Sequence, residues 1–371
     1  MKILLYANTD WFLYNFRLAT AEAMSARGDE VVLVTPPGRY SLKLQEAGFR
    51  WVEFRMERRG ANPFVEAGTI SHLARLYRAE KPDLVHHFTI KCVLYGSLAA
   101  RISGIRTTVN SLTGLGYVFT GRRFLIRVAI GLAYRLILRG TATIFENPAD
   151  RDLFLERGWV NPGSSTVILG AGVDLERFQA APEPPGQPVV IFPARMLWDK
   201  GAGEFVAAAR ALRAQGSRAR FVLVGESDPG NPTGVPLSTL EGWQKEGVVE
   251  WWGWREDMEQ VLASAHIVCL PSYREGLPRT LVEAAAVGRP IVTTDVPGCR
   301  DVVTEGVNGL LVPPGQAVPL AAALRKLLDD PLMRGRMGAG GRRVAEEKFG
   351  AEHIAGQTLA FYQRILESGS R

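Results

Sequence analysis

The sequence predicts an α/β protein with two doubly wound domains in tandem, each built on a parallel sheet that helices cover on both faces. Three observations lead to this prediction. The chain has 371 residues, more than one hydrophobic core usually fills. Short apolar runs rich in β-branched residues alternate with helical patterns along the chain, as in βαβ units. Residues 182–188 contain four prolines, which cannot continue a helix or pair in a central strand, and they separate two such series.

The first series occupies residues 1–180, which we assign to an N-terminal domain. Its apolar opening, residues 1–7, is too short for the core of a signal peptide and predicts a buried first strand. Expected strands lie at residues 3–7, 30–35, 51–54, 84–87, 107–110, 142–145 and 165–168. Expected helices lie at residues 14–27, 41–47, 64–80, 93–103, 124–138 and 148–157.

The second series occupies residues 187–349, a C-terminal domain that a linker at 180–188 joins to the first. Expected strands lie at residues 189–193, 220–224, 248–251, 267–270 and 291–294, with helices at 202–215, 237–246, 258–263 and 280–287. A terminal helical region follows, and we expect its last helix, at about residues 350–371, to pack back on the N-terminal domain. Sheets of this type bind ligands beyond the carboxyl ends of their strands, so we expect the two domains to face a ligand-binding cleft.

Composition excludes several classes of protein. Hydrophobic residues make up 46% and charged residues 22% of the chain, as in a folded globular protein. The three cysteines are scattered and form no CxxC pair, so we expect neither a disulfide framework nor a zinc site, and a reducing cytoplasm suits the chain. Arg127 and Arg135 interrupt the longest apolar region, residues 124–138, which excludes a membrane span.

Positive charge is concentrated in the first half of the chain. Residues 1–185 hold 23 Lys and Arg against 17 Asp and Glu, whereas residues 186–371 hold 21 against 21. No acidic residue lies between Asp83 and Glu146, a field that attracts anions. No nucleic-acid recognition motif accompanies it, so we expect no nucleic-acid partner. The basic residues of this stretch are Lys91, Arg101, Arg106, Arg122, Arg123, Arg127, Arg135 and Arg139.

The helix expected at residues 124–138 has two interpretations. Its arginines form one slanting stripe on an otherwise apolar helix, with Tyr117, Phe119 and Phe124 before or in it, and such a helix can lie in a membrane interface. A core helix whose arginines reach solvent has a similar pattern. Because the surrounding stretch lacks acids, we predict peripheral membrane contact through the basic 117–139 region.

Several polar residues follow strands of the second series. Arg195 and Lys200 come after the strand at 189–193 and before a helix, where a guanidinium and an ammonium can hold a diphosphate from two sides. The alternative is a pair of solvated surface cations. Gly225 and Glu226 end the strand at 220–224, and a glycine there lets a ligand approach the backbone.

The segment from Ser272 to Ala286 carries the strongest local signal. Glu275 lies in a loop whose Gly276-Leu277-Pro278 leads into a helix, and Glu283 lies further along that helix. Free amides at a helix start suit a phosphate, and carboxylates suit the hydroxyls of a ribose or a sugar. The alternative is that Glu275 caps the helix and Glu283 makes a structural salt bridge.

Together these residues resemble a known family. Arg195 with Lys200, Gly225-Glu226, and glutamates spaced as E-x7-E are similar to the donor site of the retaining nucleotide-sugar glycosyltransferases of family 4, which have the GT-B fold of two Rossmann-like domains. The resemblance covers essentially the whole chain, including residues 170–178, 292–299 and 306–312. It implies a diphosphate held by Arg195, Lys200 and the amides of Gly276, Leu277 and Pro278, a sugar at Glu275, a ribose at Glu283, and a nucleobase flanked by Trp254 and Arg255.

The first half resembles the branch of that family that builds capsular polysaccharide, exopolysaccharide, O-antigen or related glycans on lipid carriers. The resemblance rests on residues 14–17, 88–91 and 111–119. It implies a polyprenyl-diphosphate saccharide as acceptor, and a basic surface suits such an acceptor in an anionic leaflet. Many relatives have a histidine where Thr113 precedes Gly114 here; His86 and His87 either reach the cleft or are packed strand ends. The candidate acceptor residues are Asn15, Arg17, His87, Lys91, Thr113 and Gly114.

The resemblance implies a cytoplasmic enzyme, peripheral on the inner face of the cell membrane, that transfers a sugar from a nucleotide sugar, by family habit a UDP-sugar. The donor-side half contains no Asp-x-Asp motif, so we expect no metal or other cofactor, and Arg195 and Lys200 then neutralise the leaving group. A nucleotide-sugar 2-epimerase of the same fold and a non-catalytic sugar-binding protein remain alternatives. A dinucleotide oxidoreductase is disfavoured because no G-x-G-x-x-G follows the first strand.

Overall fold

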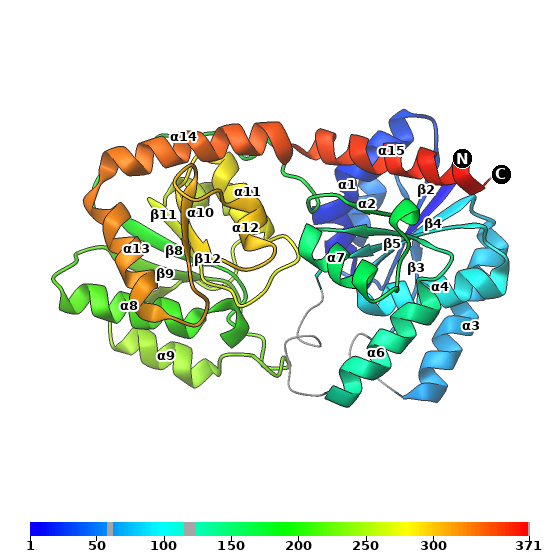
Figure 1. The fold of residues 1–371 in the computed structure, drawn as a ribbon, viewed down its shortest axis with the longest axis horizontal. Helices are drawn as coiled ribbons and strands as arrows, with labels where there is room; N and C mark the ends of the chain where they lie inside the picture. Colours follow the sequence, from blue (N-terminus) through cyan, green and yellow to red (C-terminus); the bar gives the residue numbers. More distant parts are fainter. Residues whose placement is uncertain (58–61, 115–123, 370–371) are drawn as a thin grey trace. The chain divides into compact units, whose positions relative to one another are not determined.

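A computed structural model of the chain describes residues 1–57, 62–114 and 124–369 (Figure 1). It divides into two compact units that we describe separately. Unit 1 comprises Met1–Gly172 with Ala351–Arg371, and unit 2 comprises Val173–Gly350.

Unit 1 alternates strands and helices. In chain order its elements are β1 (Lys2–Tyr6), α1 (Asp10–Ala26), β2 (Glu30–Thr35), α2 (Ser41–Glu46), β3 (Arg50–Glu53), α3 (Pro63–Glu80), β4 (Leu84–Phe88), α4 (Ile90–Ser103), β5 (Thr107–Leu112), α6 (Phe124–Ile137), β6 (Ala142–Phe145), α7 (Pro148–Glu156), β7 (Ser165–Val167) and α15 (Ala351–Gly369). The strands pair in parallel in the order β3-β2-β1-β4-β5-β6-β7.

Helices cover both faces of the unit 1 sheet, because successive side chains of each buried strand point to opposite sides. Ile3 and Leu5 of β1 share a core with α1, α2 and α15. Leu4 and Tyr6 share the opposite core with α3 and α4. A continuous apolar run in the sequence is therefore divided between two cores.

Unit 2 repeats this plan. Its elements are β8 (Val189–Pro193), the 3-10 turn η2 (Trp198–Lys200), α8 (Ala202–Ala214), β9 (Arg220–Val224), α9 (Leu237–Lys245), β10 (Glu250–Trp251), α10 (Met258–Ala263), β11 (Ile267–Leu270), α11 (Arg279–Ala286), β12 (Ile291–Thr294), α12 (Cys299–Val302), β13 (Gly309–Val312), α13 (Ala317–Asp329) and α14 (Pro331–Lys348). The strands pair in parallel in the order β10-β9-β8-β11-β12-β13. The predicted fold class, two doubly wound parallel-sheet domains, is confirmed; the cleft between them stays a prediction.

The boundary between the units lies earlier than the proline-rich segment predicts. Residues 173–183, which precede or begin that segment, are anchored to unit 2. Arg289 donates hydrogen bonds to the carbonyls of Ala181 and Pro182 at 2.9 and 2.8 Å. Arg334 pairs with Glu183 at 2.6 Å. The prolines therefore end a segment that is already packed, and they do not mark the point where the chain leaves unit 1.

The start of α1 and the strand β13 also differ from the prediction. α1 begins at Asp10, four residues before the predicted start, because Thr9 caps it and accepts a hydrogen bond from the amide of Phe12 at 3.1 Å. The short strand β13 lies where the sequence predicts only helix after residue 294. Within residues 1–57, 62–114 and 124–369, none of the helices has both the length and the hydropathy that crossing a membrane requires.

Candidate active site

The loops that follow the strands of unit 2 meet at the carboxyl edge of its sheet, because its paired strands are parallel. β8 leads into Arg195 and Lys200, and β11 leads into the 271–278 loop. The loops after β9, β10 and β12 end at the same edge. Every predicted donor residue lies on one of these loops except Glu283, which lies in α11.

The carboxylate of Glu275 is held from two sides. Lys200 Nζ lies 2.5 Å from Glu275 Oε1 and 2.6 Å from Oε2. Ser272 is buried, and its Oγ donates to Glu275 Oε1 at 2.7 Å. Thr294 in turn donates a hydrogen bond to the Ser272 carbonyl. The arrangement places one cation and one oriented carboxylate side by side. A cation of this kind can bind a phosphate, and a carboxylate can accept a hydrogen bond from a sugar hydroxyl.

Two glycines allow the loops around this pair to touch through their backbones. Gly201 has a φ of 80°, and a Cβ on it would overlap the carbonyl oxygen of Pro271. A Cβ on Gly298 would lie 2.8 Å from Glu275 Cβ. The amide of Glu275 donates to the Pro297 carbonyl at 3.3 Å. The backbone therefore fixes the approach of Glu275 to its neighbours.

Arg195 has a different partner from Lys200. Its Nη1 lies 3.0 Å from Asp228 Oδ2, and 58% of its side chain is exposed. Each of the two cations predicted to hold a diphosphate is thus paired with a carboxylate here. A phosphate that reached Arg195 would have to compete with Asp228 for its hydrogen bonds.

The loops after β9 and β10 are joined through Gly225. Its amide donates to the Gly253 carbonyl at 2.8 Å, and its carbonyl accepts from Trp251 Nε1 at 2.8 Å. A Cβ on Gly225 would overlap the carbonyl oxygen of Ala194. Glu226 takes part through its backbone, because its carbonyl accepts from the amide of Met196 at 2.9 Å.

The predicted base-binding residues lie next in the chain. The Trp254 side chain is 42% exposed. Arg255 makes two hydrogen bonds to Asp257, at 2.7 and 2.5 Å. This pairing raises the pKa of Arg255 and lowers the pKa of Asp257. The segment therefore presents an exposed indole beside a fixed guanidinium.

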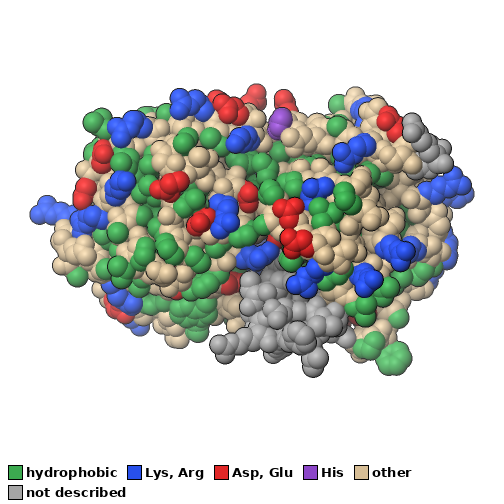
Figure 2. Space-filling model, in the orientation of Figure 1, with side chains coloured by type: hydrophobic (Ala, Val, Ile, Leu, Met, Phe, Trp, Pro, Cys, Tyr) green, Lys and Arg blue, Asp and Glu red, His purple; other side chains and the backbone are tan. Residues whose placement is uncertain are grey.

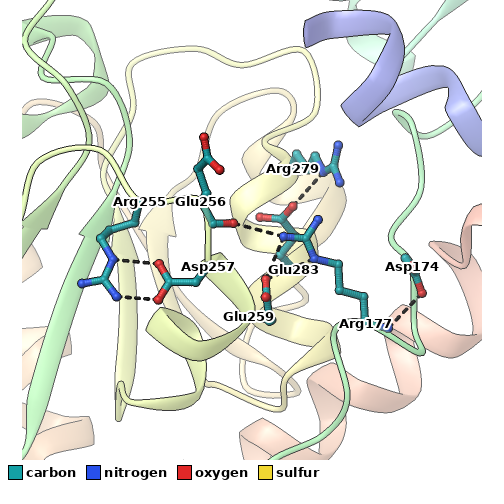
Figure 3. Close-up of polar contacts among 8 residues, drawn as sticks. All are labelled: Asp174, Arg177, Arg255, Glu256, Asp257, Glu259, Arg279 and Glu283. Atoms are coloured by element: carbon teal, nitrogen blue, oxygen red, sulfur yellow. Dashed lines mark hydrogen bonds and ion pairs between the residues drawn. The ribbon is translucent and has the colours of Figure 1, made fainter. Parts of the chain in front are cut away.

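Glu283 lies in a group of charged side chains (Figure 3). Arg279, one helical turn earlier in α11, lies 2.7 Å from Glu283 Oε1. Arg177 extends from the segment before the proline-rich stretch to Glu259 and to the Glu256 carbonyl. Burial raises the pKa of Glu283, and the charges of Arg279 and Arg177 oppose that rise.

The start of α11 follows the predicted pattern. Pro278 is the N-cap residue and supplies no side-chain hydrogen bond to the first turn. The α11 amides are oriented toward the loop that carries Gly276 and Leu277. This end of the helix is a second source of positive potential in the loops after β11.

In unit 1, the predicted acceptor residue Arg17 is buried. Its Nη2 pairs with Glu146 at 3.3 Å, its Nη1 donates to the Gly170 carbonyl at 3.3 Å, and its guanidinium lies 4.7 Å from the centre of the Phe88 ring. Arg17 therefore links three segments of the unit. Asn15 is half-buried, and its Nδ2 donates to the backbone carbonyl four residues earlier, at 3.0 Å.

His87 lies in the core and not at a ligand site. Its Nε2 is 2.9 Å from the Tyr77 hydroxyl and its Nδ1 is 2.9 Å from Asn110 Oδ1. The side chain is fully buried, and burial lowers its pKa to about 4. This corrects the assignment of His87 to the acceptor site, because both ring nitrogens are occupied within the core. The packed strand end, the other interpretation of the sequence, is the one that the structure has.

Lys91, Thr113 and Gly114 lie at the carboxyl edge of the unit 1 sheet. Lys91 Nζ is 2.6 Å from Glu66 Oε1, in the first turn of α3, and donates to the Glu57 carbonyl, so it links the segment after β3 to α3. Thr113 and Gly114 follow β5 and are half-buried, and Gly114 has a φ of 98°. Of the 117–139 region, Tyr117, Phe119, Arg122 and Arg123 lie outside the described residues.

Sequence reasoning missed several partners of the predicted residues. Arg279 has a recognisable signal, since it lies four residues before Glu283 in a helix. Asp228 and Arg177 have no such signal, because their pairing depends on how separate segments fold. Ser272 pairs with Glu275 within one loop, three residues later. The missed partners are Ser272, Asp228, Asp257 and Arg279. Arg177 and Glu259 pair with each other and act on Glu283 through their charges.

The chain carries one Asp-x-Asp triplet, Asp150-Arg151-Asp152, in α7 of unit 1. Asp150 is buried and accepts a hydrogen bond from Asn147 Nδ2 at 3.2 Å, whereas Asp152 is exposed. Residues two apart in a helix do not face one another, so these carboxylates do not share one site. In the part of the chain that the structure describes, no three His, Cys, Asp or Glu side chains form a group that could hold a metal ion.

Two family models match the chain, one on each unit. The model described as "Glycosyl transferase 4-like" matches residues 2–147, and "Glycosyl transferases group 1" matches residues 187–330. One curated relative is the N,N'-diacetylbacillosaminyl-diphospho-undecaprenol alpha-1,3-N-acetylgalactosaminyltransferase of Campylobacter jejuni, 28% identical over 99% of this chain and 100% of the relative. Another is the UDP-Gal:alpha-D-GlcNAc-diphosphoundecaprenol alpha-1,3-galactosyltransferase of Escherichia coli, 26% identical over 70% of each chain.

A solved structure with the same fold is that of HepE from Anabaena in complex with UDP-glucose. It aligns with a TM-score of 0.78 at 21% identity, over 100% of this chain and 99% of that one. One assignment follows from two findings. The two family models match successive units, and the fold agrees over the whole length of the chain. The chain belongs to the family 4 and group 1 glycosyltransferases and has the GT-B fold.

Proposed function

We propose that the chain is a retaining glycosyltransferase that moves a hexose from a nucleotide sugar, in our proposal a UDP-sugar, to a hydroxyl of a polyprenyl-diphosphate saccharide, without a metal. The observation that carries the proposal is the contact of Lys200 with the oriented Glu275 carboxylate at the carboxyl edge of unit 2. The acceptor class is supported by the relative from Campylobacter jejuni, whose name specifies a diphospho-undecaprenol acceptor. The donor class is supported by the relative from Escherichia coli, whose name specifies UDP-Gal.

In this mechanism donor binding rearranges the two ion pairs. The diphosphate takes the positive charges of Lys200 and Arg195, with the α11 amides as further donors. Glu275, freed from Lys200, accepts hydrogen bonds from sugar hydroxyls, and Glu283 accepts from the ribose. The bond between the anomeric carbon and the phosphate oxygen breaks with its electron pair on the phosphate. The acceptor hydroxyl attacks from the same face, and its proton passes to that phosphate oxygen.

We expect Lys200→Ala and Glu275→Ala each to lower transfer by about a hundredfold or more, because each removes a charge that acts on the reacting centre. The measurement is transfer of labelled sugar from a UDP-sugar to an undecaprenyl-diphosphate saccharide, with circular dichroism as the check on folding. Lys245→Ala is the matched control, since Lys245 is exposed at the end of α9. Near-normal turnover in both site variants would overturn the assignment.

A 2-epimerase would act on the donor alone, whereas a transferase also requires an acceptor. Incubating the enzyme with the UDP-sugar and no acceptor therefore separates the two functions. A transferase leaves the sugar of the donor unchanged. Accumulation of the 2-epimer would favour the alternative.

We also infer that the enzyme is peripheral on the inner face of the cell membrane, through the basic 117–139 region. Basic side chains predominate over acidic ones on the part of unit 1 that Figure 2 shows. In α6, Leu132 and Leu136 are 56% and 60% exposed. Arg101 donates hydrogen bonds to the carbonyls of Leu136 and Ile137, which holds the end of this helix against α4. An exposed apolar stripe beside arginines suits an anionic bilayer.

Vesicles that contain phosphatidylglycerol test this inference. We expect the native chain to float with them, and the double substitution Leu132→Ser and Leu136→Ser to reduce the bound fraction several-fold. Leu332→Ser is the control, because Leu332 is 76% exposed but lies in unit 2. Equal binding of all three proteins would contradict a role for α6.

A further inference from the structure

Arg177, in the 173–178 segment, extends its side chain into the charged group around Glu283 (Figure 3). Its Nη2 lies 2.9 Å from Glu259 Oε2 and 3.1 Å from the Glu256 carbonyl, and its Nε lies 3.1 Å from the same Glu259 oxygen. These contacts join a segment near residue 177 to the start of α10, about 80 residues later in the chain. The 256–259 segment that Arg177 holds directly follows Trp254 and Arg255.

The position of Arg177 is fixed by its own segment. Asp174 Oδ1 accepts hydrogen bonds from the amides of Glu176 and Arg177 at 3.0 and 2.9 Å. The guanidinium lies 5.3 Å from the centre of the Phe178 ring, which is itself buried. The amide of Val173 donates to the Phe349 carbonyl at 2.7 Å. The turn therefore directs the side chain toward α10 and α11 before any ligand is present.

Three charges act on the Glu283 carboxylate. Arg177 is one of them, and it is paired with another, Glu259. Arg279 on α11 and Arg177 favour the charged carboxylate, whereas Glu259 on α10 opposes it. Because Arg177 is paired with Glu259, it also neutralises the opposing charge. The Glu283 side chain is 8% exposed, so water provides little of this compensation.

We propose that Arg177 is a positioning residue for nucleoside recognition: it anchors the 256–259 segment behind the base-binding loop and supplies positive charge that keeps Glu283 an acceptor for the ribose hydroxyls. The inference rests on the proposed function, because it takes a nucleotide at Glu283 as given. It goes further by assigning a role to a residue outside the loops at the carboxyl edge of the unit 2 sheet.

The test compares two ligands that differ at the nucleoside end. Arg177→Met should weaken binding of uridine diphosphate by about tenfold, because its nucleoside contacts are disturbed. Binding of inorganic pyrophosphate should change less than about twofold, because Lys200 and Arg195 are untouched. Arg177→Lys keeps the charge and should lie closer to the native chain. Arg210→Met is the matched control, since Arg210 pairs with Glu246 on another part of unit 2 and should leave both affinities unchanged.

A second arm separates this role from general destabilisation. As the pH is lowered, the affinity of Arg177→Met for uridine diphosphate should fall more than that of the native chain, because Glu283 loses a charge that favours its ionised form. Adding Glu259→Gln should recover part of that loss, because it removes the opposing charge. A structural defect alone would give neither effect.

The outcomes are distinguishable. If the native chain binds pyrophosphate but no nucleoside diphosphate, the proposed function itself fails. If the native chain binds uridine diphosphate and Arg177→Met binds it equally well, the inference on Arg177 is wrong while the function stands. Parallel loss of both ligands in Arg177→Met, or no recovery on adding Glu259→Gln, also overturns the inference.

Discussion

Gly201 follows Lys200 directly, and it determines how closely the loop of Lys200 approaches the loop of Glu275. Its φ of 80° costs a residue with a Cβ about 1 to 2 kcal/mol. A Cβ would in addition overlap the carbonyl oxygen of Pro271. The contact between the two loops therefore requires glycine for two separate reasons.

We expect Gly201→Ala to lower the free energy of unfolding by about 2 to 4 kcal/mol, since backbone strain and steric overlap add. Gly216→Ala is the control, because Gly216 has a similar φ of 83° but open space around its Cβ position. Gly216→Ala should lower the free energy of unfolding only by the cost of the positive φ, about 1 to 2 kcal/mol. Urea denaturation of the three proteins measures both values. Equal losses in the two variants would show that the contact with Pro271 contributes nothing.

At the scale of residues, sequence reasoning selected residue types, and the structure decides their contacts. It selected Lys200 and Glu275, which the structure brings within 2.5 Å. It also assigned His87 to the acceptor site, although His87 is inside the core. The residue type suggests what a side chain can do, whereas its accessibility depends on which face of a strand it occupies and what covers that face.

The strand β4 illustrates this at the scale of elements. His86 and His87 are consecutive, so they point to opposite faces of the sheet. His86 contacts the Tyr362 hydroxyl of α15 and lies 2.8 Å from Ser111 Oγ. His87 faces Tyr77 of α3. Burial lowers the pKa of both imidazoles, and each histidine packs on a different face of the same strand.

We expect unit 1 to lose stability in mild acid. The folded pKa of His87 is about 4, below the 6.5 of an unperturbed imidazole, so the unfolded chain binds more protons between these values. The contribution of neutral His87 to the free energy of unfolding is complete above pH 6.5. It decreases as the pH falls, and about 3 kcal/mol of it is lost at pH 4. Urea denaturation of the native chain and of His87→Gln at pH 7, 5.5 and 4 measures it. The same dependence of the free energy of unfolding on pH in both proteins would contradict the prediction. The titration of carboxylates affects both proteins equally, so the comparison removes it.

Element types were easier to predict than element ends. Alternating apolar and helical patterns gave the order of strands and helices in both units, because the pattern is local. The start of α1 was missed because it depends on one side chain, Thr9, that caps the helix. The strand β13 was missed because a run of four residues, Gly309–Val312, is too short to have a period of its own.

At the scale of the whole molecule, the last helix belongs to the first unit. α15 contributes Ile354, Phe361 and Tyr362 to the core that β1 and α1 also form. The chain therefore leaves unit 1 after Gly172 and returns to it at Ala351. Unit 1 cannot complete this face of its sheet until the end of the chain has folded.

Deletion of Ala351–Arg371 should therefore destabilise unit 1 selectively, since it exposes a buried apolar face. We expect amide hydrogen exchange to become faster in β1, β4 and α1 and to stay unchanged in β8, β9 and β11. Hydrogen exchange with peptide-level resolution measures this in the full chain and the deletion variant. Uniform acceleration in both units would show that they are not independent in stability.

The sequence by itself determined the α/β class, the tandem plan and the kinds of charged groups near the carboxyl edges of the strands. These follow from local periodicity and from the parallel direction of consecutive βαβ units. Only the tertiary structure decided which groups meet: Lys200 with Glu275, Arg177 with Glu259, and His87 with the core. These contacts join residues of separate elements, and their distances are set by the packing of loops and sheets, which no local pattern encodes.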